Sequence, residues 1–229
     1  VDGDGSLDVV AGTYNGVNRL YLNNGTADPF NGVSGSDISS DSDWTRSVAL
    51  GDVDGDGDLD LVAGNTLNQT NRLYLNDGSA DPFNGVSGSD LSADAHMSAS
   101  VVLADLDGDA DLDLAVGNDD SAANRLYLNE CTLNPYHGVS GENISGNTYD
   151  TRSLAVGDVD GDGDLDLAAG NDDQTNVLYL NNGTATPFGG VIGRGFGSAW
   201  ATWSVALGDM DGDGDLDAVT GNDGQANKL

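Results

Sequence analysis

The sequence Asp52-Val-Asp54-Gly-Asp56-Gly57-Asp58-Leu-Asp60 places a carboxylate at every second position around a glycine. It lies between two apolar segments, residues 47–51 and 59–64. Two like charges about 4 Å apart repel by about 4 kcal/mol at an effective dielectric constant of 20. A compact cation is therefore expected to hold these side chains together. Calcium suits them, because it is a hard ion that takes six to eight oxygen ligands in flexible geometry.

The same stretch recurs along the whole chain, and its first copy lacks the first residue. The third position of the loop is Asp2, Asp54, Asp107, Asp160 and Asp211, so the spacing is 51 to 53 residues. Other blocks recur in phase with it, such as Asn-Arg-Leu-Tyr-Leu-Asn, which ends at Asn23, Asn76 and Asn129. Self-similarity at a fixed period is the signature of a repeat architecture.

Each repeat has the pattern of short strands separated by turns. Residues 59–63 and 72–76 alternate roughly between apolar and polar side chains, which is the period of a half-buried strand. We expect residues 48–53 to form the innermost strand and these two segments the second and third, with a fourth strand within residues 83–91. A unit of about 50 residues with four short strands has the size of a propeller blade. The sequence therefore predicts an all-β, propeller-like array, with the Asp loop between the first and second strands of each blade.

The repeats form one predicted β-propeller, a partial or complete ring of about four and a half units. The expected units are a partial blade at 1–46, blades at 47–98, 99–151 and 152–202, and a partial blade at 203–229. Val1 already lies inside a loop, and Leu229 lies inside a motif that is complete earlier. We therefore expect a fragment of a longer protein, and both a closed ring and an arc of a larger ring remain open.

The composition limits the possible partners and the location. Seven Lys and Arg stand against 39 Asp and Glu, and the formal net charge is −32. This charge excludes general nucleic-acid binding, which needs a basic surface, and argues against attraction to anionic membranes. No apolar run has membrane length, so direct membrane insertion is not expected, and the single cysteine, Cys131, excludes a disulfide framework. Because weak calcium sites fill at extracellular calcium levels, we expect an extracellular or cell-surface location.

The Asp-x-Asp-x-Asp-Gly-x-x-Asp loop, in units of this length, resembles the FG-GAP repeat of integrin α-chain propellers. It is most similar to the bacterial VCBS-type version, and the resemblance covers essentially the whole chain. An EF-hand is disfavoured, because that loop needs a Glu at position twelve, where this chain has Ala63. The resemblance implies about four to five structural Ca²⁺ ions per chain, bound by side chains at positions one, three, five and nine and by the carbonyl at position seven.

The implied ligand residues follow the loops in order. They are Asp2, Asp4, Ser6 and Asp8; Asp52, Asp54, Asp56, Asp58 and Asp60; Asp105, Asp107, Asp109, Asp111 and Asp113; Asp158, Asp160, Asp162, Asp164 and Asp166; and Asp209, Asp211, Asp213, Asp215 and Asp217. The first loop lacks position one. The third has Ala110 where the family has glycine, and a positive φ there would cost about 1 kcal/mol. The alternative for all five loops is a set of solvated acidic turns without metal.

The resemblance implies a calcium-stabilised scaffold that binds a protein or glycan, as in adhesion, without catalysis. The alternative is an accessory or catalytic propeller of an extracellular polysaccharide-acting enzyme, since similar repeats accompany such modules. Trp44, Trp200 and Trp203 are either packing between blades or a sugar-stacking platform. The least regular region is 189–203, which contains Arg194, and we expect a ligand there.

Overall fold

The computed structural model describes residues 1–229 except 131, 133, 137 and 138, so the single cysteine, Cys131, lies outside the described residues. Every regular element in the described part of the chain is a β-strand, and paired strands are antiparallel. Among the described residues, no helix has the length and apolarity needed to cross a membrane. The predicted all-β class is therefore confirmed.

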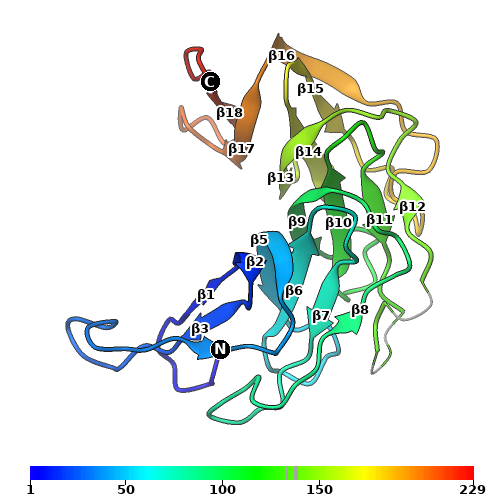
Figure 1. Ribbon diagram of the computed structural model, residues 1–229. Helices are drawn as coiled ribbons and strands as arrows, with labels where there is room; N and C mark the ends of the chain where they lie inside the picture. The colour runs from blue at the N-terminus through cyan, green and yellow to red at the C-terminus, as the bar shows by residue number, and fades with distance from the viewer. Residues whose placement is uncertain (131, 133, 137–138) are drawn as a thin grey trace.

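The described strands form five small sheets (Figure 1), which follow one another along the chain except that one short strand of the second sheet lies within the first. The first contains β1 (Val9–Ala11), β3 (Arg19–Tyr21) and β4 (Ser36–Asp37). The second contains β2 (Tyr14–Gly16), β5 (Asp43–Gly51), β6 (Asp60–Asn65), β7 (Arg72–Tyr74) and β8 (Ser89–Asp90). The third contains β9 (Ser98–Ala104), β10 (Asp113–Asn118), β11 (Arg125–Tyr127) and β12 (Glu142–Asn143). The fourth contains β13 (Thr151–Gly157), β14 (Asp166–Asn171), β15 (Gln174–Tyr179) and β16 (Arg194–Trp200), and the fifth contains β17 (Thr202–Gly208) and β18 (Asp217–Asn222).

The strand order within the complete sheets follows the predicted order, but the first strand begins earlier than expected. β5 starts at Asp43 instead of residue 48, because the Thr45 hydroxyl donates a hydrogen bond to the Asn65 side-chain oxygen at 2.8 Å. This buried pair fixes the far end of the first two strands. The same bond recurs in the three following sheets, between Ser98 and Asn118, Thr151 and Asn171, and Thr202 and Asn222.

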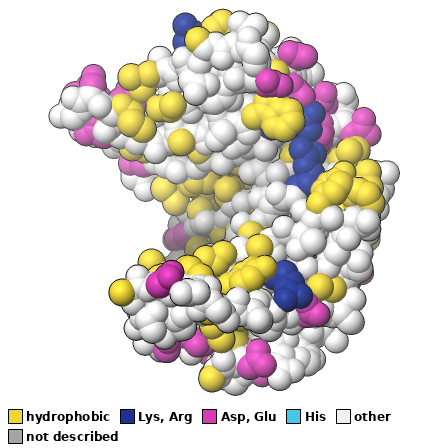
Figure 2. Space-filling view, turned by 60° about the vertical axis from the view of Figure 1, so that its left-hand side comes forward, with side chains coloured by type: hydrophobic (Ala, Val, Ile, Leu, Met, Phe, Trp, Pro, Cys, Tyr) yellow, Lys and Arg dark blue, Asp and Glu magenta, His cyan; other side chains and the backbone are white. Residues whose placement is uncertain are grey.

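The sheets are arranged like blades around an axis, and the ring is not closed. The first strands β5, β9, β13 and β17 are neighbours in chain order and form the inner side of the array (Figure 1). The N-terminal and C-terminal sheets lie on the two sides of an opening, and hydrophobic side chains are visible along it (Figure 2). The structure is thus an open, propeller-like array.

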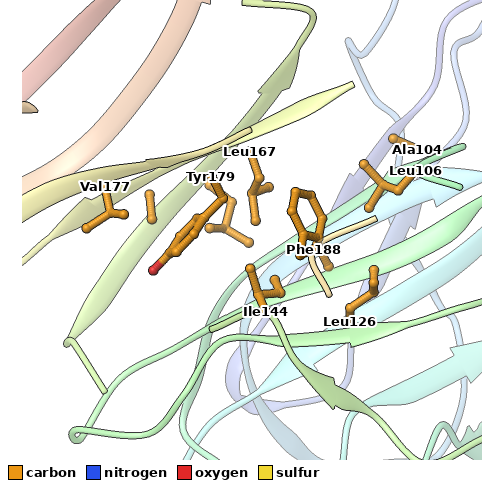
Figure 3. Packing of buried hydrophobic residues seen from close by; sticks show 11 residues of the cluster. Ala104, Leu106, Leu126, Ile144, Leu167, Val177, Tyr179 and Phe188 are labelled. Atoms are coloured by element: carbon orange, nitrogen blue, oxygen red, sulfur yellow. The ribbon is translucent and has the colours of Figure 1, made fainter. Parts of the chain in front are cut away.

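Large apolar side chains fill the space between neighbouring sheets. Leu126 and Ile144 from the third sheet region pack against Leu167, Tyr179 and Phe188 from the fourth (Figure 3). All five are at most 4% exposed. Full burial of such a side chain contributes about 1.5–3 kcal/mol, so contacts between sheets contribute substantially to the stability of the array.

Candidate metal centres

Four of the five predicted Asp loops connect the first strand of a sheet to the second. Residues 52–59 join β5 to β6, and the corresponding loops join β9 to β10, β13 to β14 and β17 to β18. The placement of the loop between the first and second strands is therefore confirmed. All four loops lie at the same end of their sheets, since the sheets are equivalent.

In each of these loops, three carboxylates converge. One oxygen from each of the first, third and ninth positions lies within 4.8 Å of the others. The clusters are Asp52, Asp54 and Asp60; Asp105, Asp107 and Asp113; Asp158, Asp160 and Asp166; and Asp209, Asp211 and Asp217. Two oxygens on opposite sides of a calcium ion are about 5 Å apart, because each Ca–O distance is about 2.3–2.6 Å. The spacing of these oxygens therefore accommodates one calcium ion per loop.

The first-position aspartate shapes the loop through backbone hydrogen bonds. Asp52 accepts the amide N–H of Gly55 at 2.8 Å with one oxygen and that of Gly57 at 3.0 Å with the other. Asp105, Asp158 and Asp209 accept equivalent amides in their own loops. These bonds curl the chain around the cluster, which brings the third-position carboxylate back toward the first.

The ninth-position aspartate anchors the loop to the sheet. Asp60 is 0% exposed, and its two oxygens accept the amides of Val53 at 3.0 Å and Asn76 at 2.8 Å. Asp113 and Asp166 make the same pair of bonds. Burial, which penalises a charged carboxylate, raises the pKa of Asp60 to about 6, and the same cause raises the pKa of Asp113 to about 6.

The third position carries uncompensated negative charge. Partial burial and the neighbouring Asp56 carboxylate raise the pKa of Asp54. Partial burial and Asp109 raise the pKa of Asp107 in the same way. A group whose ionised form is disfavoured by its neighbours gains most from a cation, so the loops are electrostatically suited to bind one.

The fifth and seventh side chains lie outside the three-carboxylate clusters. In the second loop, the Asp56 side chain accepts the amide N–H of Asp58 at 2.9 Å, as in an Asx-turn. The Asp58 carboxylate lies against the turn at Gly78, 2.6 Å from where a Cβ of that residue would be. These contacts assign the fifth and seventh side chains a part in the loop backbone and in the neighbouring turn. The predicted ligand roles of the fifth side chain and of the seventh backbone carbonyl stay predictions.

The first and third loops differ from the others. Among the described residues, no three-carboxylate cluster forms from the predicted ligands Asp2, Asp4, Ser6 and Asp8. In the third loop the cluster is complete although Ala110 holds a φ of 77°, where the glycines of the second, fourth and fifth loops have φ of 97–99°. The backbone strain predicted for Ala110 is therefore present.

The sequence interpretation missed a side chain that connects each loop to its neighbour. The Asn129 amide group donates to the carbonyl oxygen of Leu112 in its own loop at 3.3 Å and to that of Val53 in the preceding loop at 2.7 Å. Asn76 and Asn181 make the equivalent bonds to preceding loops. These asparagines recur at the end of the block Arg-Leu-Tyr-Leu-Asn, which reads Val-Leu-Tyr-Leu-Asn at residues 177–181. That recurrence was the sequence signal for a shared structural role. Each of these asparagines therefore links its own loop to the preceding loop by hydrogen bonds.

Aromatic and arginine side chains lie at the opposite ends of the first strands. Arg46 pairs with Asp119 at 3.1 Å, and Arg152 pairs with both Asp119 and Asp172. The Arg152 guanidinium also lies 5.5 Å from the centre of the Trp203 ring. These contacts connect the second, third, fourth and fifth sheets, so at least Trp203 takes part in packing between sheets. Arg194, from the predicted ligand region, is exposed at the start of β16.

Comparison with known proteins places these loops in a known class. A family model described as FG-GAP-like repeat matches residues 1–63, 105–169 and 158–220, which together make up more than half of the chain. Cartilage acidic protein 1 from Homo sapiens is 28% identical over 205 residues, covering 84% of this chain and 29% of that protein. The same protein from Mus musculus is also 28% identical and is covered over 30% of its length. The chain spans less than a third of these curated relatives.

A solved structure supports the fold. The crystal structure of the V. cholerae biofilm matrix protein Bap1 aligns with 95% of this chain and 32% of its own, with a TM-score of 0.51 and 20% identity. At this identity the likeness concerns the fold alone. Together, the repeated loops, the sheet architecture and the family match show that the chain belongs to the FG-GAP-like repeat family.

Proposed function

We propose that the Asp loops bind calcium and that the protein is a calcium-stabilised extracellular scaffold, which binds a protein or glycan without catalysis. One observation carries the calcium part of this proposal. In the described part of the chain, none of the carboxylates of the four clusters forms an ion pair with a lysine, arginine or histidine. Three carboxylates that converge without a protein cation repel one another, and a cation from solution would relieve that repulsion.

The donor set favours calcium over other metals. All the converging groups are carboxylate oxygens, whereas structural zinc sites use mainly sulfur and nitrogen ligands. Magnesium demands near-ideal octahedral geometry at about 2.0–2.1 Å and keeps several waters. Carboxylate oxygens separated by up to 4.8 Å suit the longer Ca–O distances better. The bound ion would offset two of the three formal negative charges of the cluster and tie the first strand to the second.

The ninth-position aspartate determines how a bound ion would stabilise the fold. The ninth-position aspartate already joins the loop to the end of the third strand, as Asp60 joins Val53 to Asn76. A ligand that binds only the folded state adds its binding free energy to folding, about 2.7 kcal/mol per site at a hundredfold excess over Kd. The units with the proposed bounds 47–98, 99–151, 152–202 and 203–229 would then each depend on its loop, whereas the proposed unit 1–46 has no such cluster among its described residues.

The proposed location and partners rest on the relatives and on calcium supply. Both relatives are named cartilage acidic protein 1, and cartilage is a tissue with abundant extracellular matrix. Weak calcium sites fill at the calcium levels outside cells. An array of repeated sheets offers an extended surface, which is suited to present a binding site for a protein or glycan.

Two experiments test the two parts. Native mass spectrometry of the intact chain in calcium should show four bound ions, and Asp54→Asn should remove one of them, whereas Asp90→Asn should remove none. Retention of all four ions by Asp54→Asn would contradict the assignment of the second loop. Glycan arrays and pull-downs with the calcium-loaded protein test the scaffold role, and the absence of any partner would contradict it.

A further inference from the structure

Two buried asparagines lie between neighbouring Asp loops. Asn129 lies between the second loop (residues 52–60) and the third (105–113), and Asn181 lies between the third and the fourth (158–166). Each follows the third strand of its sheet by two residues, and both are at most 7% exposed. Because each asparagine contacts two loops, the carboxylate clusters of those loops are physically connected.

Asn129 bonds to groups of two different clusters. Its backbone N–H donates to an oxygen of Asp113 at 2.8 Å, and Asp113 is the ninth-position carboxylate of the third cluster. Its side-chain amide donates to the Val53 carbonyl oxygen at 2.7 Å. Val53 lies between Asp52 and Asp54, the first- and third-position carboxylates of the second cluster. One residue therefore joins a carboxylate of the third cluster to the backbone that positions two carboxylates of the second.

Asn181 repeats this arrangement in the next sheet. Its backbone N–H donates to the ninth-position Asp166 at 2.8 Å, and its side chain donates to the Leu106 carbonyl oxygen at 2.7 Å. Leu106 lies between Asp105 and Asp107 of the third cluster. The second, third and fourth clusters therefore form a connected series, and the third has a connection on each side.

An apolar contact accompanies the hydrogen bonds between the second and third loops. Leu112 occupies the eighth position of the third loop, directly before Asp113. A Cβ on Gly51 would lie only 2.6 Å from a Leu112 methyl group, and Gly51 directly precedes Asp52. Leu112 also packs against the core cluster that contains Val53. The third loop is thus packed against the residues on both sides of Asp52.

These contacts give the clusters a physical means to influence one another. An ion in the third loop would fix Asp113, and with it the Asn129 backbone that bonds to this carboxylate. The fixed Asn129 side chain would hold the Val53 carbonyl oxygen, so that the second loop loses less conformational freedom when it binds its own ion. The coupling free energy between two sites is reciprocal, so an ion in the second loop would favour binding in the third equally.

We infer that the second, third and fourth loops bind calcium with positive cooperativity, and that Asn129 and Asn181 are the positioning residues that couple them. The inference rests on the proposed calcium binding and adds the way in which one site regulates the next. The net contribution of one hydrogen bond inside a protein corresponds to about a fivefold change in an equilibrium constant. Each filled neighbour should therefore raise the calcium affinity of a loop by about fivefold.

The third loop gives the sharpest test, because it has a neighbour on each side and carries the strained Ala110, so that it fills after its neighbours. The readout is the calcium concentration that half-protects residues 105–113 from hydrogen exchange in the full chain. Asp54→Asn removes the second site and Asp160→Asn the fourth, and each should raise this concentration by about fivefold. Asp211→Asn is the matched control, because it makes the same change in the fifth loop, which does not adjoin the third. It should shift the concentration by less than about 1.5-fold.

Alanine substitutions test the two asparagines separately. In Asn129→Ala, the further change Asp54→Asn should no longer affect the third loop, whereas Asp160→Asn should keep its full effect. In Asn181→Ala the two effects should be exchanged. A purely structural role of the asparagines would weaken the fold without this crossed pattern. If one alanine variant does not fold, the other still tests the coupling between its own pair of loops.

Three results would overturn the inference. They are a calcium dependence of the third loop that stays unchanged in both Asp54→Asn and Asp160→Asn, an equal shift in Asp211→Asn, and an effect of Asp54→Asn that persists in Asn129→Ala. Calcium-dependent protection that arises independently at each loop would contradict the cooperativity alone. If calcium protects no loop of the unsubstituted chain, the proposed function itself fails, and the inference fails with it.

Discussion

Aspartate side chains occur in two electrostatic settings in this protein. Outside the loops, several pair with arginine, namely Asp41, Asp90, Asp94, Asp119 and Asp172. Although partial burial opposes it, the hydrogen bond and charge of Arg72 lower the pKa of Asp41. In the second loop, burial raises the pKa of Asp54 and of Asp60. The chain therefore supplies its own cations to the first setting but not to the second, and the difference points to a cation from solution in the loops.

The largest difference between the two settings is expected at the ninth loop position, in the free energy of unfolding lost on substitution. Asp60→Asn should destabilise the calcium-loaded protein by about 2–4 kcal/mol, because one buried backbone N–H then faces an NH₂ group and the site loses a charge. Asp90→Asn, at a carboxylate whose side chain is 55% exposed, should cost less than about 1 kcal/mol. Urea unfolding in calcium measures both. If Asp60→Asn costs the same in calcium and in chelator, the ninth position has only a structural role.

The pH dependence of folding stability that arises from Asp60 and Asp113 should have opposite signs with and without calcium. Burial raises the folded-state pKa of Asp60 and Asp113 from 3.8 to about 6. In metal-free protein, their protonation therefore contributes stability below pH about 4, which is lost as pH rises through about 6. Calcium must displace these protons, so its affinity at the two sites should fall about tenfold per pH unit below 6.

Thermal melts between pH 7 and pH 5, with and without calcium, measure this difference. The gap in Tm between the two forms should narrow as the pH falls. A gap that stays constant over this range would show that the ninth-position carboxylates do not exchange protons for metal.

The sixth loop position offers a smaller and reciprocal test. Ala110→Gly should stabilise the third loop by about 1 kcal/mol, and Gly57→Ala should destabilise the second by about the same amount, since both positions have positive φ. The effect should appear in calcium and in chelator alike, because it belongs to the backbone. Urea unfolding of both variants checks the signs, and equal signs would contradict the shared conformation.

The arginine-paired setting should contribute least. Arg125 lies 2.9 Å from Asp94, and both side chains are partly exposed. A double-mutant cycle with Arg125→Met and Asp94→Asn should give a coupling of at most about 1 kcal/mol that weakens with salt. The fourth sheet has Val177 and Asn147 at these positions, so the sheet forms without the pair. If the coupling free energy of Arg125 and Asp94 changes when calcium is chelated, the arginine-paired aspartates are not independent of the calcium loops, and the comparison fails.

The sequence predicted what depends on short, repeated patterns. The loops around Asp54 and Asp107 and the order of strands such as β6 and β7 followed from period and alternation alone. The early start of β5 at Asp43 was not predicted, because it depends on a hydrogen bond between Thr45 and Asn65, twenty positions apart.

Contacts between sheets were also beyond the sequence. The hydrogen bond from Asn129 to Val53 joins residues 76 positions apart, and it requires the curvature of the whole array. The fit of Val101 against Gly64 likewise depends on how two sheets pack. The asparagine and the glycine recur in every complete repeat. Their recurrence does not reveal which residues of one sheet contact which residues of the next.

The central claim is that the loop carboxylates need calcium to be stable together. Thermal unfolding of the intact chain at pH 7, in 1 mM calcium and then in excess chelator, tests it most directly. The occupied sites together should add several kcal/mol to the free energy of unfolding. Chelation should therefore lower Tm by more than about 10 °C, and added calcium should restore it. An unchanged Tm in chelator would contradict the claim and leave the loops as solvated acidic turns.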